Sequence, residues 1–164
     1  MSTALSAFTL FHVILSLIGI FSGFIVVWGL INSRRLNGWT SVFLWSTVLT
    51  SVTGYFFPFH KLLPSHILGA LSLITLAVAI YARYPRNLAG GWRRTYVVSA
   101  VLALYFNFFV LIVQLFAKVP ALHEFAPTQS ETPFKAAQCV ALVVFLALGY
   151  VSAKNFRAEQ FSAA

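Results

Sequence analysis

Apolar residues are gathered into five long runs, and polar residues are concentrated in the stretches between them. Each run is close to the roughly 20 residues that a helix needs to cross about 30 Å of hydrocarbon. Unpaired backbone groups are costly in lipid, so such runs form helices, and the short alternating segments of a membrane β-barrel are absent from the sequence. We therefore predict five transmembrane helices. Their approximate limits are 8–31, 39–57, 66–82, 95–117 and 134–153.

The connections between these runs contain charged residues, Pro or Gly, and Pro64 limits the third run upstream. The first run has no basic segment before it and exceeds the roughly 7–15 apolar residues of a signal peptide, which indicates a mature helix. We predict that residues 1–164 form one all-α domain, a polytopic bundle of membrane helices.

The composition favours lipid as the solvent of this bundle. Hydrophobic residues make up 60% of the 164 residues and charged residues 9%, against about 25% charged in a soluble domain. A soluble fold of this size leaves roughly 30% of its chain surface exposed, which so few charged residues would not cover. The single Cys139 rules out an intramolecular disulfide.

The net charge of +8 is distributed unevenly along the chain. Eight of the 11 Lys and Arg residues fall on one side of the predicted topology, and Lys61, Lys118 and Lys135 fall on the other. Because basic loops remain in the cytoplasm, we predict that the N-terminus is outside and the C-terminus inside. The charge is thereby explained without a nucleic-acid partner. The eight residues are Arg34, Arg35, Arg83, Arg86, Arg93, Arg94, Lys154 and Arg157.

Small and hydroxylic residues recur at helical spacing in the first three runs. Gly19 and Gly23 form a small-xxx-small pair on the same face as His12 and Ser16, which lets two helix backbones approach closely. The simplest interpretation is packing between helices, within one chain or in a homo-oligomer. Similar faces carry Thr47, Ser51 and Gly54 in the second run, and His66, Gly69, Ala70 and Ala77 in the third.

Polar residues also suggest a pocket near the predicted outer face. All four histidines, at positions 12, 60, 66 and 123, fall on that side, and Asn107, Gln114 and Lys118 form one stripe of the fourth helix. Polar side chains in lipid are expected to face the bundle interior or a wet cavity. The alternative is that they only form hydrogen bonds between helices. The predicted pocket residues are His12, His66, Asn107, Gln114, Lys118 and Gln138.

The last outer loop is the longest. Its apolar spacing predicts a short interfacial helix beginning at Pro120, and Thr128 to Glu131 fit a capping box before the fifth span, with Pro133 in its first turn. A sharper hypothesis is that this loop forms a lid over the pocket. The candidate lid residues are His123, Glu124, Thr128, Gln129, Ser130 and Glu131.

Catalytic chemistry is not indicated. The chain has no Asp and no nucleophile elbow, and its His and Cys residues lack metal-ligand spacing, so we assign no catalytic or metal-binding residue. A b-type haem needs two axial histidines from facing helices, which His12 and His66 would supply.

The segments HVILSLIGIFSG, LPSHILGALSL and NFFVLIVQLFAKVPALHEFAPTQSETPF resemble a family of small, uncharacterised multi-pass bacterial inner-membrane proteins with an APTQSE-type outer loop. The resemblance implies that location and no activity. A looser similarity to multi-haem b-type cytochromes lies in His66, Gly69 and the Gly-Gly-Trp-Arg loop, although paired histidines on one span are missing.

From these features we expect a ligand-binding or accessory and assembly subunit in the bacterial inner membrane rather than an enzyme. A haem-bearing electron carrier and a small transporter or channel are the alternatives. The expected partners are the lipid bilayer and either further copies of the chain or a larger membrane complex.

Overall fold

The computed structural model describes residues 3–57 and 64–157, without the side chains of residues 3, 4, 64 and 65. Within these ranges the chain forms helices joined by turns, and no strand occurs. The helices are α1 (Thr3–Ile31), α2 (Asn37–Gly54), α3 (Pro64–Arg83), α4 (Trp92–Lys118), α5 (Pro120–Phe125) and α6 (Thr132–Asn155). The all-α bundle expected from the sequence is confirmed.

Four of these helices are long and apolar enough to cross a membrane: Leu5–Ile31, His66–Arg83, Trp92–Lys118 and Thr132–Asn155. The second predicted span corresponds to α2, which ends at Gly54 rather than near residue 57. Helix α2 is not apolar enough to be counted with these four. The reason is its composition, because seven of its 18 residues are Ser or Thr. Several of these hydroxyls donate back to the carbonyl four residues earlier, as Ser46 does to Val42 at 2.6 Å.

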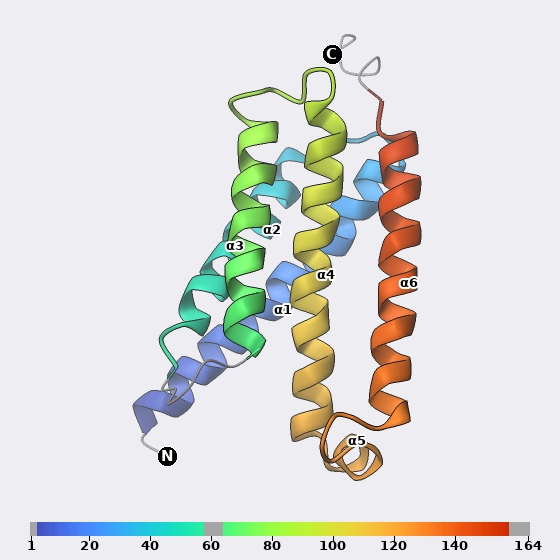
Figure 1. Ribbon diagram of the computed structural model, residues 1–164. Coiled ribbons are helices and arrows are strands. Elements are labelled where there is room, and N and C mark those ends of the chain that lie inside the picture. Colours follow the sequence, from blue (N-terminus) through green and yellow to red (C-terminus); the bar gives the residue numbers. More distant parts are fainter. Residues whose placement is uncertain (1–2, 58–63, 158–164) are drawn as a thin grey trace.

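Helix α4 is the centre of the bundle and contacts α1, α2, α3, α5 and α6. Helices α3, α4 and α6 run side by side, and α1 crosses them obliquely, so that it lies near α6 at one end and away from α4 at the other (Figure 1). The short helix α5 lies beneath the end of α4. This oblique crossing decides which faces of α4 are covered along its length.

The long helices alternate in direction, which brings both hairpin turns rich in Arg to the end of the bundle where the described chain finishes (Figure 1). We call this the basic end and the other the distal end. At the basic end Arg83 is only 7% exposed, and its guanidinium donates to Asn37 Oδ1 at 2.6 Å and to the Arg35 carbonyl at 3.2 Å. It also lies 5.2 Å from the ring centroid of Tyr96. Arg83 thus joins α3 to α4 and to the turn between α1 and α2.

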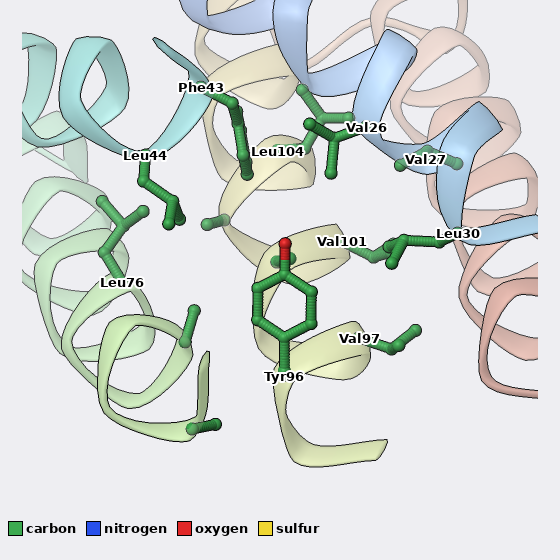
Figure 2. Packing of buried hydrophobic residues seen from close by; sticks show 14 of the residues in the cluster. Val26, Val27, Leu30, Phe43, Leu44, Leu76, Tyr96, Val97, Val101 and Leu104 are labelled. Atoms are coloured by element: carbon green, nitrogen blue, oxygen red, sulfur yellow. The ribbon is translucent and has the colours of Figure 1, made fainter. Parts of the chain in front are cut away.

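The half of the bundle nearer the basic end contains a dense hydrophobic core. Figure 2 shows Phe43 and Leu44 of α2 and Leu104 of α4 packed with residues of α1 and α3, all fully or nearly fully buried. Gly23 is essential to this packing, because a Cβ there would lie 2.5 Å from Leu104 Cδ1 and 3.0 Å from the Phe43 ring. The Gly19 and Gly23 face is therefore used within one chain, against α2 and α4, and is not available to pair two copies.

Candidate functional site

A polar cavity of about 100 Å³ lies in the distal half of the bundle, between α1, α2, α3 and α4. Most of its lining groups are hydroxyls, imidazoles, an amide or glycine, and the remainder are apolar. The lining residues are His12, Ser16, Thr50, Ser51, Gly54, Tyr55, His66, Leu68, Gly69, Ser72, Phe106, Asn107 and Val110. Four helices thus direct polar groups to one place in the bundle.

Asn107 connects the two longest helices beside this cavity. Its amide is 7% exposed, and its Oδ1 accepts a 2.9 Å hydrogen bond from the Ser16 hydroxyl. Its Nδ2 donates to the Ser16 carbonyl at 3.4 Å. One turn further along α1, the absent side chain of Gly19 leaves room for Asn107, since a Cβ there would lie 3.1 Å from Nδ2. The small residue and the amide are therefore complementary.

His12 is half-buried, and a hydrogen bond joins it to α2. Its Nδ1 lies 2.8 Å from Thr53 Oγ1, and that hydroxyl also lies 2.7 Å from the Leu49 carbonyl of its own helix. The second ring nitrogen, Nε2, completes the hydrogen-bonding capacity of the imidazole. The ring also packs edge-on against Phe57, with centroids 5.1 Å apart.

His66 lies in the first turn of α3 and is 9% exposed. Its ring packs against Tyr55 with centroids 5.7 Å apart, and the Tyr55 hydroxyl donates to the His66 carbonyl at 2.6 Å. Gly69 gives space to this tyrosine, since a Cβ there would lie 3.2 Å from the phenol oxygen. Beside it, Ser51 donates to Ser72 at 3.1 Å and joins α2 to α3.

The structure places three of the six predicted pocket residues around this cavity, namely His12, His66 and Asn107. Gln114 and Lys118 are exposed and do not line it. They share a face of α4 with Asn107, but α1 diverges from α4 toward the distal end and leaves that face uncovered (Figure 1). Gln138 is buried on α6, where its Nε2 donates to the Phe109 carbonyl at 3.3 Å, and it is not among the lining residues either.

The candidate lid residues lie over the ends of α4 and α6. The loop is held there by Ala126, which is fully buried with Phe116 and Ala141, and by Gln129, which donates to the Val113 carbonyl at 2.9 Å. His123 and Glu124 are exposed, with His123 Nδ1 3.3 Å from the Phe116 carbonyl. No described residue of this loop lines the cavity. His60 lies outside the described residues.

The predicted short helix at Pro120 is present as α5, with the proline in its first turn. The predicted capping box is not, because α6 begins at Thr132, with Glu131 as a cap that makes no side-chain hydrogen bond to the helix. The Glu131 carboxylate instead accepts from Thr128 Oγ1 at 2.8 Å and from the Thr128 and Ser130 N–H groups. These bonds lower the pKa of Glu131, the Thr128 hydroxyl contributing most.

Sequence reasoning missed several of the lining residues. The lining residues outside the predicted pocket that carry polar groups are Ser16, Thr50, Ser51, Tyr55 and Ser72. The sequence did contain a signal for two of them, because Ser16 and Ser51 belong to the small-residue faces of the first two runs. Those faces were interpreted as contacts between packed helices. Tyr55 gave no signal, since it follows the end of α2 and its contact with α3 is tertiary.

The cavity does not suit a haem. Its volume of about 100 Å³ is well below the roughly 300 Å³ at which cofactor sites begin. The space beside His66 is filled by Tyr55, whose ring packs against the imidazole. Among the described residues, no group of three or more His, Cys, Asp or Glu is placed to hold a metal ion.

The polar groups of the cavity form uncharged hydrogen bonds, and they are set in a lining whose surface is more apolar than polar. Donors and acceptors are both present, in the hydroxyls, the Asn107 amide and the imidazoles, and among the described residues no carboxylate, Lys or Arg lines the cavity. Burying an ion in lipid without a counter-charge is expensive, so a neutral polar guest is favoured. Comparisons with protein-family models, with curated proteins and with solved structures found no match to this chain.

Proposed function

We propose that the chain is an integral membrane protein whose polar cavity binds a small, uncharged, polar molecule without covalent chemistry. The observation that carries this proposal is the convergence of polar groups from α1, α2, α3 and α4 on one cavity. The function is binding, in a free-standing protein or in a subunit of a larger membrane complex.

The size of the cavity limits the guest. A cavity of 150 Å³ accommodates benzene, with six non-hydrogen atoms, so about 100 Å³ accommodates about four. Simple amides and related neutral molecules have this size and both donate and accept hydrogen bonds. With so few atoms, ligand efficiency limits the binding free energy to about 6 kcal/mol at best, and millimolar dissociation constants are expected.

We further propose five spans in a bacterial inner membrane, with the N-terminus outside and the C-terminus in the cytoplasm. Eight of the 11 Lys and Arg residues belong to the basic end, which the positive-inside rule assigns to the cytoplasm. Helix α2 connects the basic end to the distal end and is about 27 Å long, near the thickness of the hydrocarbon. Its back-bonded hydroxyls reduce the cost of its polar side chains in lipid.

Binding is favoured over a continuous pathway because the cavity is closed toward the basic end. The core around Phe43, Leu104 and Tyr96 is fully buried, and the close approach at Gly23 leaves no room for a second cavity there. A channel would need these side chains to separate. An electron carrier would need space for a porphyrin, which the cavity lacks.

A matched pair of probes tests the binding proposal. Acetamide and acetate have the same number of non-hydrogen atoms, but only acetate is charged at neutral pH. We expect acetamide at tens of millimolar to raise the thermal unfolding midpoint of the purified chain, and acetate at equal ionic strength to have a smaller effect. The Asn107→Leu variant should lose the response to acetamide, whereas Gln114→Leu, an equal change on the exposed part of α4, should keep it.

Two results would contradict the proposal: an equal response to both probes, or an undiminished response of Asn107→Leu to acetamide. The orientation is tested separately with Cys139→Ser as background. An impermeant maleimide should label Ser130→Cys in intact cells and Arg157→Cys only after permeabilisation. The opposite pattern would invert the topology while leaving the cavity chemistry untouched.

A further inference from the structure

A second hollow, apolar and larger, lies between α4 and α6. Its volume is about 400 Å³, and its walls include Val98, Leu102, Leu142 and Leu146. Gly149 forms part of the hollow, since a Cβ there would meet only Val101 Cγ1, at 3.6 Å. We call this the α4–α6 groove. It is separate from the polar cavity, with which it shares no lining residue.

The groove has the length of one membrane leaflet. Along α6 it extends from Leu142 to Ala153, about 16 Å at the helical rise of about 1.5 Å per residue. Half of the hydrocarbon thickness is about 15 Å. The groove ends close to the last residue of α6, Asn155, so it occupies the half of the bundle nearer the basic end. An acyl chain of the leaflet at that end matches it in length and polarity.

Two cationic side chains lie at the end of this groove nearest the basic end of the bundle, which we call its polar end. Arg94 precedes Val98 of the wall by one turn of α4, and Lys154 follows Tyr150 of the wall by one turn of α6. Both side chains are exposed, and neither has a hydrogen-bond or ion-pair partner among the described residues.

Few carboxylates are available to neutralise these cations. The chain has three, of which Glu124 and Glu131 lie at the distal end and Glu159 falls outside the described residues. The polar end of the groove is therefore positively charged and complementary to an anion.

We propose that the α4–α6 groove binds one anionic phospholipid, with an acyl chain between the two helices and the phosphate between Arg94 and Lys154. Basic sites between helices at a membrane surface recognise anionic headgroups through such pairs of cations. The inference goes beyond the polar cavity and depends only on the bundle lying in a membrane.

A second copy of the chain is a poorer occupant of the groove. Copies inserted in one membrane with the same topology would place their basic ends side by side. Arg94 and Lys154 of one copy would then face the like charges of the other, which is unfavourable at short distance. A phospholipid brings the opposite charge to the same place.

Lipid titration of the full-length chain, followed by native mass spectrometry, tests the headgroup contact. Phosphatidylglycerol and phosphatidylcholine with identical acyl chains are compared. We expect preferential retention of phosphatidylglycerol, and about 30-fold weaker binding of it in the double variant Arg94→Gln/Lys154→Gln, since each cation near the surface contributes about fivefold. The matched control Arg34→Gln/Arg86→Gln removes two exposed cations of the same end outside the groove and should leave the affinity nearly unchanged.

Filling the groove tests the acyl-chain contact. Gly149→Leu should displace both lipids without loss of helical circular dichroism, because the added Cβ has ordinary contact distances. Gly38→Leu, at a glycine with nothing within 4 Å of an added Cβ, is the control and should retain lipid. Three results would each overturn the proposal. The two charge variants could lose affinity for phosphatidylglycerol equally, or the unmodified chain could retain the two lipids equally. The chain could also form a dimer that Gly149→Leu abolishes.

Discussion

Ser16 of α1 and Asn107 of α4 form a reciprocal pair, in which the serine hydroxyl donates to the amide oxygen at 2.9 Å and the amide nitrogen donates to the serine carbonyl at 3.4 Å. The two residues are 91 positions apart in the chain. Their contact fixes the rotation of α4 relative to α1 and thereby brings the amide to the cavity. The same pair contributes to stability and to the site.

A double-mutant cycle on this pair should give a coupling free energy of about 0.6 kcal/mol, and at most about 1.7 kcal/mol, as for other hydrogen bonds between membrane helices. The variants are Ser16→Ala, Asn107→Leu and their combination, with unfolding followed in mixed micelles. Additive effects would show that the pair contributes no energy and that the amide serves the cavity alone. Gln114→Leu should leave the free energy of unfolding nearly unchanged.

Gly23→Ala should destabilise the bundle by about 1–3 kcal/mol, the usual cost of overpacking a core. The added Cβ would lie 2.5 Å from Leu104 Cδ1, so this fully buried side chain would have to shift within the core. Gly38→Ala, in open surroundings on α2, should be neutral or slightly stabilising. Equal stability of the two variants would mean that Gly23 of α1 and Leu104 of α4 are not in this close contact.

Arg83→Gln should cost about 2–4 kcal/mol of unfolding free energy, because the shorter side chain leaves the Arg35 carbonyl and the Asn37 amide without their donor and removes the cation from the Tyr96 ring. Arg86→Gln removes an exposed guanidinium that lies 4.8 Å from the ring centroid of Trp92 and should cost about 0.5–1 kcal/mol. A similar small cost for both would show that Arg83 is an ordinary surface cation. Chemical unfolding in mixed micelles measures both.

The turn before α6 should loosen in acid. Hydrogen bonds from Thr128 and Ser130 hold the pKa of Glu131 below its usual value of 4.5, so the carboxylate stabilises the turn at higher pH and this contribution is lost as pH falls through the lowered pKa. The protection factor of the Thr128 amide, the intrinsic exchange rate divided by the observed rate, should therefore fall as pH is lowered through that pKa. Glu131→Gln should show a low protection factor at every pH, and a pH-independent protection factor in the unmodified chain would contradict the assignment.

Much of this architecture was determined by the sequence itself. Apolar runs long enough for lipid allow only helices, prolines 64, 120 and 133 mark their beginnings, and eight of 11 basic residues mark one end. These properties are local, since hydropathy, helix initiation and loop charge depend on neighbours in the chain. The limit of this reasoning appears in α2, where a helix is present but seven Ser and Thr residues keep its hydropathy below that of the other spans.

The membership of the site was decided only by the tertiary structure. Asn107 and Gln114 occupy one face of α4, and no periodicity distinguishes them, yet one is buried against Ser16 and the other is exposed. The difference arises because α1 crosses α4 at an angle and covers its face at one level only (Figure 1). A crossing angle depends on how the side chains of two helices fit together, as Gly23 and Leu104 do. It therefore cannot be predicted from the sequence of either helix alone.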